Sequence, residues 1–481
     1  MSNTGPESTV LRAASGGVGG RLRRPGGDAG EGRTRLRLQL EGGIQFLLAQ
    51  LVIWVGLAAG NVDPWNLPVG RLVRWVVLAE LGVFALAYAA TARGFFPRPG
   101  RAAAAFACFV AVAFLSTGWS TDPGLTFGRA ASFAAVVAIG AAVALGARRG
   151  SDGARPFLLA LLAGAAVLAV LGLIHLASNY DDAVVPATRG QGARYTGIGA
   201  NPDTLAMLYA IVLPLALWAL LEARARWEKF VAAATFLLLD GSLAASSSRG
   251  AIVAAFAGLT VLVLLVPLSR RARVALVAAS VALFAANAVA GTIPPRSAVD
   301  PVLNERFGQT PPLAARDATH VLPLENEIGF PGRGGAYRNR ELLDAGGRWP
   351  AWKGAVRQAA DRPLVGYGFG LEERVFVDRY YPFISDRPEN SYLGLLLQLG
   401  IIGLVAAVVV FAVAIASGIR TVGRVRGSER AVTAACLSVL AAGAVLALAQ
   451  SYLTSVGSPP TVPLWICALL LVVPRPMRTP P

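Results

Sequence analysis

Long apolar runs separated by short basic loops dominate the chain. Runs of about 20 apolar residues have the length needed to cross a hydrocarbon core of about 30 Å, and they predict about twelve transmembrane helices. The expected spans are 43–60, 74–92, 102–119, 129–147, 156–176, 202–222, 230–245, 251–268, 273–292, 390–416, 431–452 and 461–474. The run from 230 to 268 forms either one long helix or two helices with a break at 246–250. The predicted fold class is all-α, a polytopic membrane helix bundle.

One long polar insertion interrupts this pattern and defines the domain organisation. It predicts a large external loop at 293–389, between helices nine and ten of the predicted order. We expect a partly ordered lid rather than a linker, with a short amphipathic helix from Trp352 onward. The remaining divisions are a disordered basic tail at 1–42, transmembrane helices at 43–292 and 390–474, and a second tail at 475–481.

Charge placement predicts the orientation of the bundle. The 481 residues carry a net charge of +16, a value that by itself suggests nucleic acid. The arginines lie in loops between spans, however, where anionic lipid head groups are the nearer partner, so we expect membrane lipids and no nucleic acid as partners. Alternate short loops differ in arginine content by roughly three to one. The bias places both termini in the cytoplasm of a plasma (inner) membrane protein, with the insertion outside.

Residues suited to metal binding are sparse. The only histidines are His175 and His320, and no zinc-like spacing occurs. The first predicted outside loop holds only Asp63, so it offers no acidic pair for a metal. We therefore predict no metal and no cofactor. The three cysteines all lie in apolar runs, so disulfides are not expected.

A polar turn, Ser246-Ser-Ser248-Arg249-Gly250, lies between two apolar runs. Arginine at membrane depth costs about 2.5–3.5 kcal/mol, so Arg249 must lie at the interface or face a hydrated cavity. It is either a snorkelling or capping residue or, with Ser248 beside it, part of a pocket for an anionic group. Asp240, within the preceding apolar run, is expected to face the protein interior.

The downstream half of the insertion carries a second group of polar motifs. Arg348-x-x-x-Trp352 is followed by Gly366-x-Gly368-x-Gly370 and then by Glu389-Asn390 at the start of the next apolar run. Guanidinium groups at the membrane face beside a carboxylate suggest a phosphate-bearing lipid substrate, because preorganised arginines stabilise negative charge on phosphate groups. Arg348 and Arg249 are the predicted diphosphate contacts, with simple ion-pair or interface roles as the alternative. Glu389 is either the base for the acceptor hydroxyl or a helix cap.

Five motifs in this order resemble the O-antigen ligase and Wzy-type polysaccharide polymerase superfamily. They are Leu115-Ser-Thr-Gly-Trp119 with Arg129, Gly197-x-Gly199-x-Asn201, Ser248-Arg249-Gly250, Arg348-x-x-x-Trp352 with Pro363-Leu-x-Gly366, and Asn390-Ser-Tyr-Leu393. The resemblance implies a membrane glycosyltransferase that uses a polyprenyl-diphosphate-linked glycan donor and a glycan or lipid acceptor. Together with the chemistry above, we predict catalysis by Glu389, Arg348 and Arg249, and substrate binding by Ser248, Asn201, Arg129, Asn390, Trp352 and Gly366.

One position departs from the family pattern. Where the ligases commonly carry a histidine before the asparagine of the last motif, this chain has Glu389. A glutamate at this position resembles the polymerase-like branches more than the lipopolysaccharide ligases. The sequence therefore predicts either ligation or polymerisation. We expect metal-independent transfer by an inverting-type displacement on the outer face of the membrane. A secondary transporter and a non-catalytic protein of envelope assembly are the competing classes, although the helices divide unequally around the insertion, without an evident half-repeat.

Overall fold

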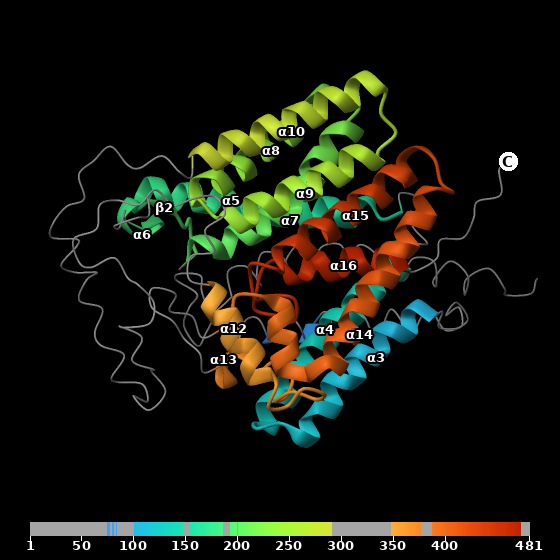
Figure 1. Ribbon diagram of the computed structural model, residues 1–481. Helices are drawn as coiled ribbons and strands as arrows, with labels where there is room; N and C mark the ends of the chain where they lie inside the picture. The colour runs from blue at the N-terminus through green and yellow to red at the C-terminus, as the bar shows by residue number, and fades with distance from the viewer. Residues whose placement is uncertain are drawn as a thin grey trace, which may run out of the picture.

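Long apolar helices make up most of the computed structural model (Figure 1). The structure describes residues 101–147, 153–185, 193–199, 201–290, 348–376 and 387–472, together with Trp75, Val76, Ala79, Glu80 and Val83. The long helices are α3 (Arg101–Leu115), α4 (Pro123–Ala147), α5 (Arg155–Ser178), α7 (Pro202–Glu222), α8 (Arg226–Ser246), α9 (Arg249–Leu265), α10 (Arg270–Ala290), α12 (Arg348–Ala359), α14 (Ser391–Val422), α15 (Gly427–Leu446) and α16 (Thr461–Val472). The short elements are η1 (Ser116–Trp119), α6 (Tyr180–Ala183), α13 (Glu372–Val375) and an antiparallel pair of strands, β1 (Val184–Val185) and β2 (Arg194–Tyr195).

Seven segments in the described part of the chain are long and apolar enough to cross a membrane. They correspond to α3 with η1, α4, α5, α7, α8, α14 and α15, whereas α9 and α16 are shorter apolar helices. The protein is therefore a mostly helical, multi-pass membrane protein. The predicted span 43–60 and most of 74–92 lie outside the described residues, so the count of twelve stays a prediction, as does the external position of the insertion.

The run from 230 to 268 forms two helices with a sharp turn between them. Helix α8 ends at Ser246, and Ser247 adopts a left-handed conformation with φ 51°. Helix α9 starts at Arg249, with Ser248 as its N-cap residue. The polar turn thus ends one helix and begins the next at one end of the bundle. Within α8, Asp240 is buried and accepts a hydrogen bond from Asn287 of α10 at 3.1 Å, as the interior placement predicted.

Helix α7 lies at the centre of one half of the bundle, where it packs against α8, α9 and α15. Small residues allow these helices to approach closely, as is common in membranes. A Cβ on Gly258 of α9 would lie 2.7 Å from the Pro214 ring of α7 and 2.9 Å from the Ala442 side chain of α15. The outer faces differ, because α8 and α14 expose large apolar side chains such as Phe230, Leu237 and Val405. Such faces suit contact with lipid.

Helix α14 is broken at Gly400 (φ 62°, ψ −161°), and the end of the insertion fills the break. Ile401 N–H donates to the Pro363 carbonyl at 2.8 Å, and Tyr367 N–H donates to the Leu397 carbonyl at 2.9 Å. A non-helical backbone within a membrane span is tolerated only where protein or water satisfies its polar groups. The segment from Pro363 to Gly368 supplies these partners, which joins the insertion to the bundle.

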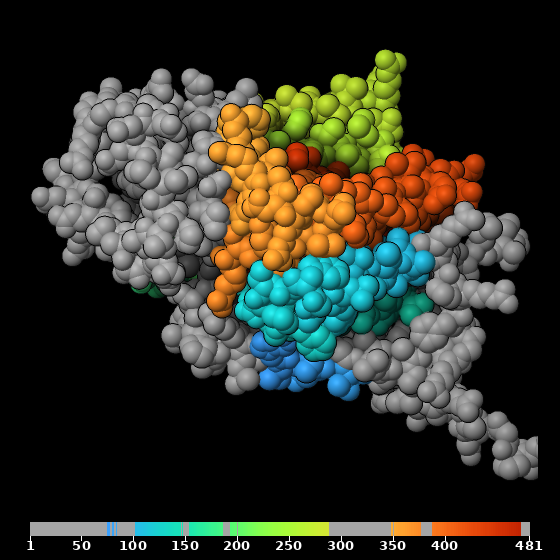
Figure 2. Space-filling model, turned by 60° about the horizontal axis from the view of Figure 1, so that its bottom comes forward, coloured from blue at the N-terminus to red at the C-terminus, as the bar shows by residue number. Residues whose placement is uncertain are grey.

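Phe369 anchors the same segment in the apolar core. Its side chain is fully buried, with ring centroids 5.6 Å from Phe133 of α4 and 6.5 Å from Phe109 of α3. Its backbone N–H donates to the Ser116 hydroxyl at 3.0 Å. In Figure 2 the orange residues of the insertion lie directly on the turquoise residues of α3 and α4. This part of the insertion is thus an integral part of the fold.

The two ends of the bundle differ in character (Figure 1). The strands and α6 lie on the left side of the view, and α12 and α13 lie below them on the same side. The α9–α10 and α14–α15 connections lie at the right end, where Arg430 Nε donates to the Leu265 carbonyl at 3.0 Å. The arginine-rich connections predicted to be cytoplasmic thus lie opposite the end that carries the insertion.

Candidate functional site

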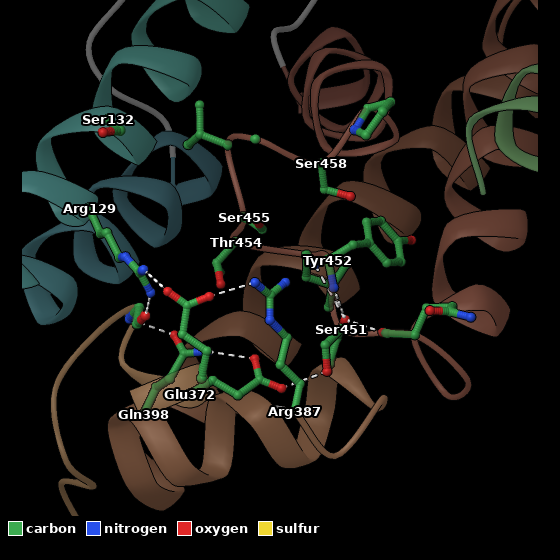
Figure 3. Close-up of a pocket in the computed structure, with 18 of the residues that line it drawn as sticks. Arg129, Ser132, Glu372, Arg387, Gln398, Ser451, Tyr452, Thr454, Ser455 and Ser458 are labelled. Carbon is green, nitrogen blue, oxygen red and sulfur yellow. Dashed lines mark hydrogen bonds and ion pairs between the residues drawn. The ribbon is translucent and has the colours of Figure 1, made fainter. Parts of the chain in front are cut away.

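A polar cavity of about 660 Å³ lies at the insertion end of the bundle (Figure 3). Parts of the segments 124–132, 201–207, 370–374, 387–391 and 450–459 line it. The first turns of α4, α7 and α14 therefore meet the loop between α15 and α16 there. Each of these helices starts after a connection that the arginine distribution predicted to be external. Four connections far apart in the sequence thus share one site.

Three arginines line this cavity. Arg129 from the first turns of α4, Arg374 from α13 and Arg387 before α14 all line it. Glu373 bridges two of them: it pairs with Arg129 and accepts a bond from Arg387 at 2.6 Å. Burial raises the pKa of Glu373, but the hydrogen bond and charge of Arg129 and the charge of Arg387 outweigh burial and hold the pKa below its ordinary value. Glu373 is therefore a charged clamp on the two guanidiniums.

A second carboxylate, Glu372, is buried beside this clamp. Its Oε1 accepts a hydrogen bond from the Ser451 hydroxyl at 2.5 Å, and its Oε2 accepts one from the Gln398 amide at 3.2 Å. Burial raises its pKa to about 7, an effect that the charge of Glu389 increases and that of Arg387 opposes. The charge on this side chain therefore changes close to neutral pH.

Glu389 lines the cavity two residues before α14 begins. It adopts φ 50°, a left-handed conformation that costs energy for a residue with a Cβ. Asn390, rather than Glu389, is the N-cap of α14, because its side-chain oxygen accepts hydrogen bonds from the N–H groups of Tyr392 and Leu393. The Asn390 amide also donates to the Leu448 carbonyl at 3.1 Å. These contacts fix the backbone and leave Glu389 at the cavity wall.

The Ser-Arg-Gly turn approaches the cavity at Asp203 of α7. The Asp203 carboxylate accepts a bond from Arg194 of β2 at 2.7 Å, and it also hydrogen bonds with Ser248. Arg348 is close enough to interact with the same carboxylate through charge. Asn201 caps α7 by accepting a bond from the Asp203 N–H at 2.8 Å. Asp203 and Asn201 both line the cavity, so the turn and the start of α12 lie near one edge of it.

The structure thus separates the predicted site residues into two groups. Arg129, Asn201 and Glu389 line the cavity. The others lie around it or farther from it: Ser248, Arg249, Arg348, Trp352, Gly366 and Asn390.

Two residues of the second group have clear contacts within the fold. The Trp352 indole donates to the Pro388 carbonyl at 2.8 Å and so holds the segment that carries Glu389. Gly366 lies against the backbone of α14, where a Cβ would be 2.5 Å from the Gln398 carbonyl carbon.

Five charged residues of the cavity were not predicted as site residues. They are Asp203, Glu372, Glu373, Arg374 and Arg387. A usable signal was present, because the acidic pair directly follows the glycine-rich motif and Arg387 lies two residues before Glu389. Hydroxyl-bearing residues of the α15–α16 loop, Thr454, Ser455 and Ser458, also line the cavity, and no motif marked them.

The site holds several carboxylates without a cluster suited to a metal. Among the residues that the structure describes, no group of three or more His, Cys, Asp or Glu side chains is arranged to hold a metal ion. Metal independence stays a prediction.

The fold and cavity define a multi-pass helical membrane protein with a site of arginines and carboxylates at one end of its bundle. Residues 233–408 match the family model described as O-Antigen ligase. This match confirms the resemblance to the O-antigen ligase and Wzy-type polymerase superfamily. No curated protein gives a significant match to the chain.

The family has consequences for substrate and activity. It implies lipid-linked glycan substrates in a membrane and a glycosyltransferase-like activity. The matched range runs from α8 to the first half of α14 and includes Glu372 and Glu389. Arg129 and the α15–α16 loop lie outside this range, so the cavity is completed by other parts of the chain.

Proposed function

We propose that the protein transfers or polymerises glycan units from a polyprenyl-diphosphate donor at the outer face of the plasma membrane. The observation that carries this proposal is the shared cavity, in which arginines and carboxylates converge at one end of an O-antigen ligase-like bundle. Its volume of about 660 Å³ falls within the range of small-molecule sites, about 300–1,000 Å³. A diphosphate with its first sugar suits a space of this kind, and a longer glycan extends beyond it.

The pair of arginines bridged by Glu373, Arg129 and Arg387, is the proposed site of the donor diphosphate. Arg129 is bonded to the Gly370 carbonyl and to Glu373, yet a third of its side chain is exposed, at 33%. A guanidinium carries more N–H donors than these two bonds use. A diphosphate therefore binds by adding to the clamp or by competing with Glu373 for Arg129 and Arg387. The interaction strengthens as the leaving diphosphate gains charge, which lowers the barrier.

Glu389 is the proposed base. In an inverting displacement, the acceptor oxygen attacks the anomeric carbon as the bond to the diphosphate breaks, and the acceptor proton passes to a carboxylate. Glu389 lies at the cavity wall, and Asn390 performs the capping role that was its alternative. A neighbouring carboxylate, Glu372, makes a second negative charge unfavourable and so favours proton uptake by the pair.

Arg348 and Arg249 are proposed to contact the donor beyond the cavity rather than inside it. Arg348 interacts with Asp203 at the cavity edge, and Arg249 follows Ser248, which hydrogen bonds with the same carboxylate. Both arginines thus belong to the rim that a lipid-linked donor passes on entering. The arginine-rich connections at the opposite end of the bundle support the proposal that both arginines lie on the outer side.

Gene deletion and in vitro transfer test the proposed function. A deletion strain is expected to accumulate polyprenyl-diphosphate glycans, detected by mass spectrometry of its lipid extract, and to lose the corresponding surface glycan. Purified protein is then expected to consume that accumulated donor. A strain that accumulates no lipid-linked glycan, or a purified protein that leaves the donor unchanged, contradicts transfer.

Two variants with matched controls test the proposed roles of Glu389 and Arg129. Glu389→Gln is expected to keep the fold and donor binding but lose most turnover, whereas Glu429→Gln, exposed in the first turn of α15, retains activity. Arg129→Lys is expected to weaken donor binding, because lysine lacks the planar fork that matches phosphate. Its control is Arg424→Lys, at an exposed position in the α14–α15 connection. Wild-type donor affinity and turnover in Arg129→Lys contradict the arginine assignment.

A further inference from the structure

Glu372 is a buried carboxylate of the cavity with a hydrogen bond to each oxygen. Its Oε1 is occupied by the Ser451 hydroxyl and its Oε2 by the Gln398 amide (Figure 3). These two partners come from the α15–α16 loop and from α14, which are distant in sequence. A carboxylate held in this way has little freedom to take a proton from an incoming substrate. Its position instead links separate parts of the site.

The first link leads to Glu389. The Ser451 hydroxyl donates to Glu372 at 2.5 Å, and its oxygen accepts the N–H of Asn390 at 3.1 Å. That N–H belongs to the peptide unit that joins Glu389 to Asn390. Glu389 itself has φ 50°, a conformation that persists only where surrounding contacts impose it. The Glu372–Ser451 pair supplies one of those contacts.

The second link leads to Arg129. The Gln398 amide donates to Glu372 at 3.2 Å, and its oxygen accepts the Gly370 N–H at 2.8 Å. The carbonyl of Gly370 in turn accepts a bond from Arg129. An amide side chain has one donating and one accepting end, so Glu372 determines which end of Gln398 faces Gly370. The guanidinium is thereby tied to the same buried carboxylate.

We infer that Glu372 is a positioning residue, which holds Glu389 and Arg129 at a fixed separation across the cavity through Ser451 and Gln398. The inference rests on the proposed function, because it assigns Glu389 and Arg129 their roles in transfer. It explains why a buried acid lies beside the site without a direct part in the reaction. Misplacement of a catalytic group by about 1 Å can cost on the order of 100-fold in rate.

Space for Glu372 is provided by Gly394 on the first turns of α14. A Cβ at Gly394 would lie 2.6 Å from the carboxyl carbon and from both carboxyl oxygens of Glu372. The carboxylate is the flexible end of its side chain, so an added methyl group displaces Glu372 rather than the helix. Gly394→Ala therefore disturbs the position of Glu372 without changing any charge or hydrogen-bonding group.

The charge state of Glu372 matters to this arrangement. As observed, both oxygens accept hydrogen bonds, which is the pattern of the ionised form. The charged groups that interact with it are Arg387 and Glu389 of the 387–390 segment, while Gln398 of α14 and Ser451 of the loop are neutral. Its pKa of about 7 places protonation near neutral pH, where an added proton changes the hydrogen bonding of this carboxyl group.

The test uses two variants and their matched controls in the donor-consumption assay. Glu372→Gln and Gly394→Ala are each expected to lower turnover by on the order of 10- to 100-fold. The controls are Asp361→Asn, an exposed acid just after α12, and Gly241→Ala, a helical glycine of α8 with no atom within 4 Å of an added Cβ. Both controls should stay within about twofold of wild type.

Two further readouts distinguish positioning from a general loss of fold. The double variant should be no slower than the slower single variant, because both changes act on one side chain. The pH–activity limb near neutral pH should shift in Glu372→Gln, whereas a reduced amount of folded protein lowers activity equally at every pH. Multiplicative losses, an unchanged pH limb, or near-wild-type turnover in Gly394→Ala overturn the inference. An inactive wild-type protein refutes the proposed function instead, so the two failures are separate.

Discussion

Replacement of Gly366 by alanine tests how the insertion is joined to the bundle. Gly366 has φ 64°, and an added Cβ would lie 2.5 Å from the Gln398 carbonyl carbon and 2.6 Å from the Leu397 oxygen. Both atoms are backbone atoms of α14 and cannot rotate away. Alanine therefore introduces two penalties, a left-handed conformation and a forced separation of the two segments.

The expected cost follows from these contacts. Left-handed backbone costs a residue with a Cβ about 1–2 kcal/mol. Separation also weakens the bonds of Tyr367 N–H and Gly368 N–H to α14, now 2.9 and 2.8 Å long, and each such bond is worth about 0.5–1.5 kcal/mol. The free energy of unfolding should fall by about 2–5 kcal/mol in total.

Gly427→Ala is the matched control. Gly427 has φ 59° at the start of α15, but no atom lies within 4 Å of an added Cβ. This variant should lose only the conformational cost of about 1–2 kcal/mol. The difference between the two variants therefore measures the close approach of the insertion to α14.

Unfolding can be followed in detergent with a thiol-reactive dye. Cys436 and Cys467 are buried, and the exposed Cys108 is replaced by serine in the parent protein. Gly366→Ala should expose the buried thiols at a lower temperature than Gly427→Ala and should also lose donor turnover. Equal stability of the two variants refutes the argument that Gly366 is required for contact with α14.

Three other outcomes are expected. Phe369→Ala should destabilise the protein by about 3–5 kcal/mol, because the ring is fully buried among aromatic side chains of the core. Thermal unfolding measures this loss, and a negligible shift in melting temperature contradicts the anchoring role. The pKa of Glu372 is raised from 4.5 to about 7, so the folded state holds this proton more tightly than the unfolded chain does. Its contribution to stability is therefore greatest at acidic pH and falls as pH rises from about 4.5 through 7, and Glu372→Gln should show a smaller decline in melting temperature between pH 5 and 8. Chelator should leave transfer intact; lost activity that magnesium or manganese restores contradicts the metal-independent mechanism.

The apolar pattern was sufficient to predict the long apolar helices that the structure describes, but not the short elements η1, α6 and α13. The predicted span 202–222 coincides with α7, and the polar Ser-Ser-Ser-Arg-Gly segment does separate α8 from α9. Boundaries were less accurate where a helix continues beyond its apolar stretch. Helix α14 extends to Val422, and α4 begins at Pro123 rather than at residue 129. Apolar composition reports the part of a helix that contacts lipid or core, whereas hydrogen bonds determine where it ends.

The candidate site was predictable only in part. Glu389 and Arg129 were found because motifs marked them, and both line the cavity. Glu372 was not predicted, because an acidic pair in a polar loop is usually exposed to water. Packing against α14 buries this residue. Gly366 was predicted to bind substrate, but the structure shows its close contact with α14.

The sequence by itself predicted a multi-pass helical membrane protein that resembles the O-antigen ligases, because apolar length, arginine placement and short motifs are local properties of the chain. Tertiary structure decided which polar residues share a cavity. Arg129, Glu372, Glu389 and Ser451 come from distant segments, and only the docking of the insertion into the break of α14 brings them together. Hydrogen bonds connect the buried Glu372 to Arg129 through Gln398 and to Glu389 through Ser451. These bonds depend on distances in space, which the spacing of residues along the chain does not encode.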